Sequence, residues 1–268
     1  MQEKIINSLI VEIVSKYKLW FFIAYREILT RYERSVLGPL WITIGTALVI
    51  FILGPFYGKL LNSLQKDYLL YLSSGLIFWI FISSFINASC VSITQNKSMI
   101  LSREINPLGF VLKDLIREVI ILFHNLPLLI FLIIYTYKEN NFNFLLILAN
   151  FFAFICAFVL IVITLFFLGC LLSIICARYR DIITLISNSL ILFFFITPVL
   201  WERSILGDKF KILNLNLITY YLDIFRNPML NIKTNFFLYF IMIIFIVFLY
   251  IVTEIIYRKY KNKLKFWL

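Results

Sequence analysis

Six long runs without a charged residue are the dominant pattern of this sequence. They lie at residues 35–58, 68–96, 119–137, 140–177, 182–201 and 234–253 and are 19 to 38 residues long. A helix needs roughly 17–25 predominantly apolar residues to cross the hydrocarbon core of a bilayer. The pattern therefore predicts an all-α, polytopic membrane protein with six transmembrane helices.

The run at 140–177 leaves the number of crossings open, because its 38 residues are many for one helix and few for two helices with a turn. The positions of the positive charges decide between these readings. If the run is one helix, 17 of the 25 Lys and Arg residues lie on the side of both termini and 8 on the other. Since cytoplasmic loops carry an excess of Lys and Arg, we predict six spans with both termini in the cytoplasm.

Composition agrees with a membrane location. The 268 residues are 62% apolar and 15% charged, with a mean hydropathy of +0.96, whereas soluble domains are about 45–50% apolar and about 25% charged. The net charge of +11 is mostly an orientation signal, so no nucleic-acid partner is expected. We expect one domain over 1–268, divided into a cytoplasmic amphipathic segment (1–34), the six-span bundle (35–257) and a basic cytoplasmic tail (258–268).

The residue types that most catalytic and metal sites need are scarce. The single histidine, His124, lies in an apolar run. The four cysteines also lie in apolar runs, where we interpret them as buried apolar side chains: Cys90, Cys156, Cys170 and Cys176. We expect no catalytic residue, no metal and no cofactor bound by this chain. Residues 54–60 (GPFYGKL) lack the spacing and the final Ser or Thr of a phosphate-binding loop, so no nucleotide site is expected either.

The segment before the first span combines an apolar face with basic residues. Ile5, Leu9 and Ile13 recur at helical spacing within residues 5–17, which predicts an amphipathic helix in the membrane interface. A plain anchor and a role in presenting lipid-linked cargo both fit this helix. The basic residues at 26–35 are explained most simply as an anchor on the cytoplasmic side.

Two further connections are longer than a turn. The cytoplasmic stretch 95–118 predicts a short helix at 95–105, followed by Asp114 and Arg117 at a pairing distance of three residues. It is either a solvated helix end or a docking surface for a cytoplasmic partner. On the outer side, the apolar pieces of 202–233 are too short to cross, which predicts a re-entrant or interfacial hairpin between the fifth and sixth spans that is covered by protein or lines a cavity.

Five segments together carry a family pattern. They are residues 29–41 (LTRYERSVLGPLW), 123–126 (FHNL), 176–182 (CARYRDI), 193–201 (FFFITPVLW) and 223–228 (DIFRNP). In order and spacing the chain resembles the ABC-2 type permeases that export O-antigen, capsule and teichoic acid polysaccharides. The resemblance covers nearly the whole chain. One departure is the sequence NLNL at 214–217, where the family pattern has Asn-Pro.

The resemblance implies a homodimer joined to two ABC ATPase subunits, which bind ATP and Mg and drive an undecaprenyl-linked polysaccharide outward across the bacterial cytoplasmic (inner) membrane. The ATPase-coupling helix would contain Gln95, Asn96, Lys97, Ser98, Ile100, Arg103 and Glu104. The cytoplasmic gate would contain Arg31, Tyr32, Arg34, Asp114, Arg117, Arg178, Arg180 and Asp181. The external mouth would contain Asp223, Arg226 and Pro228.

Side chains that combine an apolar body with a polar tip are suited to sugars, because rings pack on CH groups and polar tips form hydrogen bonds. The candidates for such contacts in a channel are Trp41, Tyr71, Trp79, His124, Asn125 and Trp201. Aromatic residues also collect at membrane interfaces, and a buried histidine is ordinarily bonded within the bundle. Both explanations remain open for these residues.

Two other classes of protein fit less well. A lipid-linked glycosyl or acyl transferase needs a positioned base with a metal or paired acids, and a proton-coupled carrier needs acids within its spans, which the six runs lack. We therefore expect a transport subunit that is not itself an enzyme and that uses ATP hydrolysis from a separate subunit. An ABC-2 exporter of a small lipid-like or drug substrate remains an alternative.

Overall fold

The computed structural model describes residues 13–61, 65–102, 105–137, 144–202 and 216–268, and in these ranges all regular elements are helices. The long helices are α3 (Leu40–Leu60), α4 (Gln65–Gln95), α6 (Gly109–Tyr137), α7 (Phe144–Arg178) and α11 (Phe236–Tyr260). The shorter ones are α2 (Tyr17–Arg31), α5 (Lys97–Ser102), α8 (Asp181–Ile196), α10 (Leu217–Arg226) and the single turn η3 (Leu264–Phe266). The prediction of an all-α polytopic membrane protein is confirmed.

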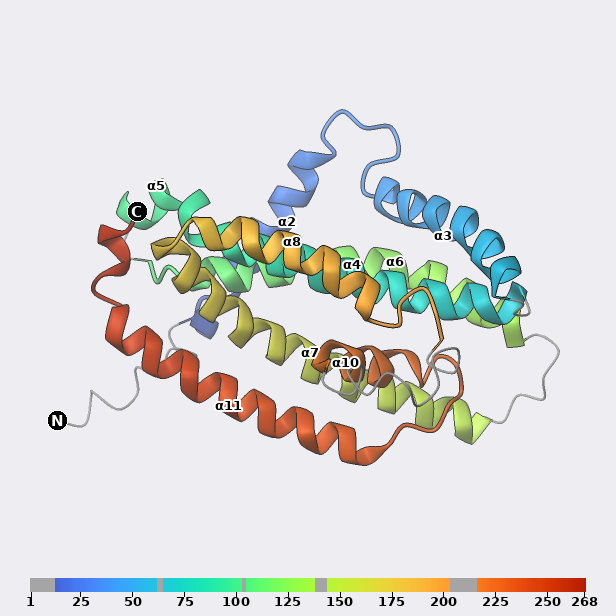
Figure 1. Ribbon diagram of the computed structural model, residues 1–268. Coiled ribbons are helices and arrows are strands. Elements are labelled where there is room, and N and C mark those ends of the chain that lie inside the picture. The colour runs from blue at the N-terminus through green and yellow to red at the C-terminus, as the bar shows by residue number, and fades with distance from the viewer. Residues whose placement is uncertain (1–12, 62–64, 103–104, 138–143, 203–215) are drawn as a thin grey trace.

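The helices form one elongated bundle around α4 (Figure 1). In its most apolar stretch α4 is 72% buried, against 17% for α3 and for α11. It packs against α3, α6, α7, α8 and α10, whereas α3 diverges from the rest of the bundle at one corner. The end of α4, the start of α8, α5 and the C-terminus gather at one end of the bundle.

Five of the six predicted spans are helices long and apolar enough to cross a membrane. The ambiguous run at 140–177 is a single helix, α7, of 35 residues, as the charge distribution predicted. The fifth predicted span, 182–201, needs a correction, because α8 has only 16 residues. At about 1.5 Å per residue it covers ~24 Å of a core that is ~30 Å thick. It ends where Thr197 becomes extended and the following Pro198 cannot donate to a further helical turn.

Helix α2 is fixed against the first turn of α6. The Trp20 ring meets the Phe110 ring edge-on at 5.3 Å, and Trp20 Nε1 donates to the carbonyl oxygen of Ile13 at 3.1 Å. Gly109 is necessary here, because a Cβ at that position would lie 2.0 Å from Cζ2 of Trp20. The predicted amphipathic helix at 5–17 falls mostly on residues 1–12, which lie outside the described residues.

The predicted outer hairpin contains α10, which is covered by protein. Asn216 caps this helix by accepting from the Ile218 amide, and its own amide donates to Thr197 Oγ1 at 2.9 Å. Phe225 of α10 packs against Phe78 of α4 at 5.2 Å and Phe154 of α7 at 5.3 Å. A helix too short to cross is thus held between two long ones, which agrees with the protein-covered alternative. Residues 203–215 of the predicted hairpin lie outside the described residues.

Candidate functional site

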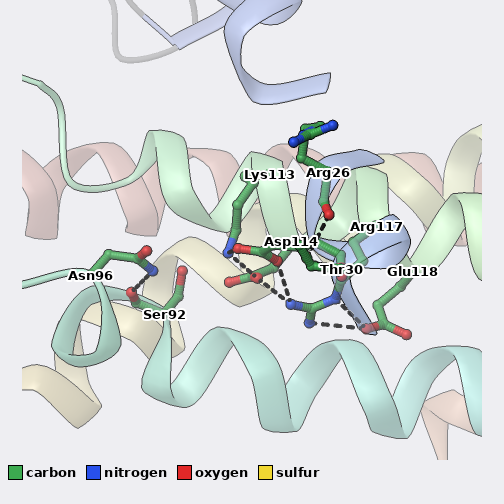
Figure 2. A network of polar contacts seen from close by, with 9 residues as sticks. Arg26, Thr30, Ser92, Asn96, Lys113, Asp114, Arg117 and Glu118 are labelled. Carbon is green, nitrogen blue, oxygen red and sulfur yellow. Dashed lines mark hydrogen bonds and ion pairs between the residues drawn. The ribbon is translucent and has the colours of Figure 1, made fainter. Parts of the chain in front are cut away.

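A cluster of five ionised side chains joins α2 to the start of α6 (Figure 2). Lys113 Nζ lies 2.7 Å from Glu27 Oε1 and 3.0 Å from Asp114 Oδ1. Arg117 Nη1 lies 3.1 Å from Glu27 Oε2 and 3.0 Å from Asp114 Oδ1. Arg117 Nη2 reaches Glu118 Oε1 at 3.0 Å. The structure confirms the predicted pair of Asp114 with Arg117 and adds the other three members.

Burial makes this α2–α6 charge cluster structurally important. The side chains of Lys113 and Asp114 are each only 4% exposed. Removing one member of a buried ion pair costs about 3–5 kcal/mol, because the remaining charge is left without compensation. The cluster therefore holds α2 and α6 together as one unit at the edge of the bundle.

The other gate candidates lie near the end of α2 and at the turn between α7 and α8. Arg31 and Arg34 are exposed at the end of α2, where the left-handed conformations of Arg34 (φ 71°) and Gly38 (φ 55°) turn the chain towards α3. Arg178 and Arg180 are exposed at the turn between α7 and α8. The sequence grouped these residues in one gate. In the structure, Arg31 is close enough to Glu118 for an electrostatic interaction and borders the α2–α6 charge cluster, whereas Arg178 and Arg180 lie at the turn between α7 and α8. The remaining gate candidates follow the same division, Tyr32 beside Arg31 and Asp181 at the start of α8.

The predicted coupling helix at 95–105 is broken into two parts. Helix α4 extends to Gln95, and α5 begins at Lys97 after the single residue Asn96. The Asn96 side-chain amide donates to the Ser92 carbonyl at 2.7 Å, which caps the end of α4 (Figure 2). Ser98 is exposed and Ile100 is buried, while Arg103 and Glu104 lie outside the described residues.

A pocket of about 280 Å³ lies at this end of the bundle. Its lining residues come from α4, α5, α8, the turn before α8 and the C-terminus: Thr94, Lys97, Ile183, Arg180 and Leu268. The Lys97 ammonium donates to the oxygen of Leu268. The sequence analysis assigned Lys97 to the ATPase-coupling helix and Arg180 to the cytoplasmic gate. In the structure both residues line the same pocket.

Polar side chains follow one face of α4 and α8 where the two helices run side by side. Ser187 Oγ donates to Asn87 Oδ1 at 2.8 Å, and Asn87, Thr184 and Asn188 are exposed. Exposed amides and hydroxyls are unfavourable against lipid chains. This α4–α8 polar face, made of Asn87, Thr94, Thr184, Ser187 and Asn188, therefore meets water or protein. Sequence reasoning missed it, although the seven-residue spacing of Asn87 and Thr94 and the four-residue spacing of Thr184 and Asn188 were a usable signal.

Three of the aromatic channel candidates lie along the same two helices. Trp79 of α4 is 7% exposed and packs against Phe194 of α8 with ring centroids 5.5 Å apart. The Tyr71 hydroxyl lies 2.8 Å from the carbonyl oxygen of Trp201, beyond the end of α8. Trp41 is on α3 and is half exposed.

The polar pair of α6 is bonded within its own helix. His124 Nδ1 lies 2.8 Å from the Ile120 carbonyl oxygen, and the Asn125 amide donates to Ile121 at 3.4 Å. The His124 carbonyl also accepts from the Thr43 hydroxyl of α3. These contacts give both side chains a role in the packing of α6.

Arg226 of α10 closes the other end of α8. Its Nη1 donates to the carbonyl of Pro198 at 2.9 Å and its Nη2 to that of Val199 at 3.4 Å. The guanidinium carbon lies 3.8 Å from the centroid of the Tyr71 ring, a close cation–π contact. A Cβ on Gly75 would lie 2.0 Å from Arg226 Nη2, so glycine leaves the necessary room.

Burial of Arg226 changes the expected character of the external mouth. The side chain is only 2% exposed, and its guanidinium lies against the Tyr71 ring. Pro228 is buried and Asp223 is half-buried. The predicted mouth residues thus lie within the packing of α10, where Arg226 satisfies the carbonyl groups left free by the end of α8.

We expect Glu27→Gln to destabilise the protein, because Lys113 and Arg117 would lose a carboxylate in a largely buried cluster. The loss should be about 1–2 kcal/mol, below the ~3–5 kcal/mol of a fully buried pair, because the Glu27 side chain is 35% exposed and both cations keep Asp114 as a partner. The midpoint of thermal unfolding in detergent measures it. The control is Glu33→Gln, at an exposed residue shortly after α2. Equal midpoints for the two variants would contradict the structural role of the cluster.

Gly75→Ala is expected to displace Arg226, since the new methyl group would overlap Nη2. The buried carbonyls of Pro198 and Val199 would lose their donor, at about 1–3 kcal/mol for each unsatisfied group. The unfolding midpoint should fall by several degrees, as it should for Arg226→Gln. Gly45→Ala is the matched control, because a Cβ there meets open space. A Gly75→Ala variant as stable as this control would show that Arg226 does not hold α8.

Comparison with protein families matches residues 18–230 to the ABC-2 type transporter. The match begins in α2, extends to the residues just after α10 and covers most of the chain. Comparison with curated proteins finds no match. The α2–α6 charge cluster, the α4–α8 polar face and Arg226 all lie within the matched region. The chain therefore belongs to the ABC-2 type transporter family, as a multi-pass membrane subunit of an ABC transporter.

Proposed function

We propose that two copies of this chain and two ABC ATPase subunits form an exporter for an undecaprenyl-linked polysaccharide, such as an O-antigen or a capsule. The chain would lie in the bacterial cytoplasmic membrane with both termini inside, and ATP with its Mg²⁺ would bind the partner subunits. The observation that carries this proposal is the α4–α8 polar face.

The chemistry of this face suits a glycan. Sugar hydroxyls exchange hydrogen bonds with amides and hydroxyls, and sugar CH groups pack on aromatic rings. Asn87, Thr184 and Asn188 provide exposed polar groups on two membrane helices. The rings of Trp79 and Tyr71 lie along the same helices but are engaged within the copy by Phe194 and Arg226, so the exposed polar groups are the contacts offered to a glycan. An apolar cargo would favour an apolar lining instead.

A second copy of the chain would complete the path. The polar groups of α4 and α8 are exposed on the outside of a single copy, so that copy lines only one side of a path. Two-fold dimers place the same surface of both copies opposite each other. Such a pairing would enclose the α4–α8 polar face between the two copies and remove it from lipid.

The contact with the ATPase is proposed to lie on α5. Met99 is 42% and Leu101 is 53% exposed on this short helix, which follows the end of α4, while Ile100 anchors it. Exposed apolar side chains next to polar ones are typical of protein contacts. Members of the ABC-2 family normally pair with an ATPase subunit, and α5 offers that partner a docking surface.

Asn188→Leu should lower export of the lipid-linked glycan about fivefold, the equivalent of one hydrogen bond of about 1 kcal/mol. The measurement is ATP-dependent transport in proteoliposomes that contain the chain and its ATPase. Ser189→Ala is the matched control, because its hydroxyl bonds within α8 to Leu185. If Asn188→Leu leaves glycan export unchanged and increases export of an apolar dye, the cargo is lipid-like or drug-like instead.

Leu101→Glu should abolish co-purification of the ATPase, because the carboxylate would be buried in the proposed contact. Pull-down from detergent-solubilised membranes measures this loss, and the unfolding midpoint should not change because Leu101 is exposed. Phe266→Glu makes the same kind of change at another exposed residue, outside α5. Equal retention of the ATPase by both variants would place its docking site elsewhere.

A further inference from the structure

The pocket at the junction of α4, α5 and α8 has the features of an anion site. It has a volume of about 280 Å³ and is lined by Thr94, Lys97, Arg180, Ile183 and Leu268. Lys97 and Arg180 belong to segments far apart in the sequence, so the fold has brought two cations to one cavity. We propose that this pocket binds a phosphate group carried on the head of a lipid.

Both cations have donors to give to such a group. An ammonium has three N–H donors, and Lys97 uses one on the oxygen of Leu268. Arg180 adds a guanidinium, whose planar set of donors matches phosphate oxygens in pairs. Asp181 follows Arg180 in the chain but is not among the residues that line the pocket. Lys97 and Arg180 thus line a small cavity without acidic side chains, and the Leu268 oxygen that already accepts from Lys97 is the group that a phosphate would compete with.

The neighbouring arginine has a different role. The Arg178 guanidinium carbon lies 5.2 Å from the ring centroid of Trp267 and 6.0 Å from that of Tyr260. It therefore holds the C-terminal segment against the bundle. Because Leu268 belongs to that segment, Arg178 helps to build the pocket wall, and Arg180 is left to face the cavity.

The position of the pocket favours a lipid as the carrier of the phosphate. Helix α7, which is long enough to span, ends at Arg178, and α8 begins at Asp181, so we expect the charged turn between them to lie at the bilayer surface. Ile183 and Leu268 give the pocket an apolar wall beside the two cations. Basic pockets between membrane helices on the cytoplasmic side are typical sites for lipid head groups. A carboxylate of the ATPase partner would need the cations but not the apolar wall.

Two lipids provide this chemistry. One is a phospholipid such as phosphatidylglycerol, and the other is the polyprenyl carrier of the proposed cargo. The second source rests on the proposed function, whereas the first requires only a membrane. The α4–α8 polar face begins at the pocket, since Thr94 belongs to both. A polyprenyl phosphate held there would place its attached glycan at the start of that face.

Native mass spectrometry of the purified full-length chain, without ATPase or glycan, tests the proposal. The probes are phosphatidylglycerol, undecaprenyl phosphate and inorganic diphosphate, added separately. The double variant Lys97→Gln/Arg180→Gln should bind phosphatidylglycerol, undecaprenyl phosphate or both at least tenfold more weakly than the unmodified chain, because each cation near a membrane surface contributes to anion affinity. The lipid that shows the loss identifies the source of the phosphate.

The control variant is Lys16→Gln/Lys18→Gln, which removes the same charge from exposed residues at the start of α2. It should bind both lipids as the unmodified chain does. Equal lipid binding by the pocket variant and the unmodified chain would overturn the proposal, and so would an equal loss in the control. If the pocket variant lost binding of inorganic diphosphate but kept binding of both lipids, the proposal would also be overturned, because the site would then bind a free ion.

A pull-down of the ATPase separates this proposal from the partner contact. If the pocket variant binds lipid normally and loses the ATPase, the two cations bind the partner, and the lipid site is wrong. Since lipid binding is measured on the isolated chain, it can succeed when glycan export fails. Failure of the proposed function and failure of this inference therefore give different results.

Discussion

The absence of water inside a bilayer is the constraint on which this structure depends. A polar group there must find a partner within the protein or face a path that contains water or cargo. The α2–α6 charge cluster satisfies the first condition, because each of its five side chains has an opposite charge within 3.1 Å. The α4–α8 polar face satisfies the first condition only in part within one copy, because Ser187 and Thr94 have internal partners while Asn87, Thr184 and Asn188 remain exposed. That difference separates groups that hold the bundle together from groups available for transport.

The short length of α8 follows from the same constraint. A helix that stops inside the membrane leaves carbonyl groups without donors, and this is tolerated only when protein supplies them. Here Arg226 supplies donors to Pro198 and Val199, and the Tyr68 hydroxyl donates to Leu200 at 2.6 Å. Because Arg226 belongs to α10, the end of α8 and the position of α10 depend on each other. Neither α8 nor α10 would be stable in lipid in this form without the other.

Features set by local sequence could be predicted, and features set by distant partners could not. The long uncharged runs predicted the positions of five long helices. The distribution of Lys and Arg between the two sides of the membrane predicted that α7 is a single helix. The pair of Asp114 and Arg117 followed from helical spacing alone. Glu27 was missed because its partners are on another helix, about 90 residues away. The pocket that joins Lys97 to Arg180 was likewise invisible, since no local pattern connects α5 with the turn before α8.

The end of α8 shows why a hydropathy pattern misplaces some boundaries. Residues 182–201 are uncharged throughout, so composition alone extends the span to Trp201. Helix α8 ends at Ile196, because Pro198 follows and because Arg226 donates a hydrogen bond to the Pro198 carbonyl just beyond the helix end. Pro198 was visible in the sequence, but the burial of Arg226 was not. A proline predicts where a membrane helix can end, and the partner in space decides whether it does.

The connection between α4 and α5 links the proposed docking surface to the proposed path. Only Asn96 separates the two helices, and its amide is bonded to Ser92 in the last turn of α4. A partner that moves α5 would therefore act directly on α4, because no flexible linker absorbs the displacement. Helix α4 carries half of the α4–α8 polar face and packs against α3, α6, α7, α8 and α10. If the ATPase docks on α5 as proposed, α4 is the shortest mechanical route from ATP hydrolysis to the surface that the cargo would contact.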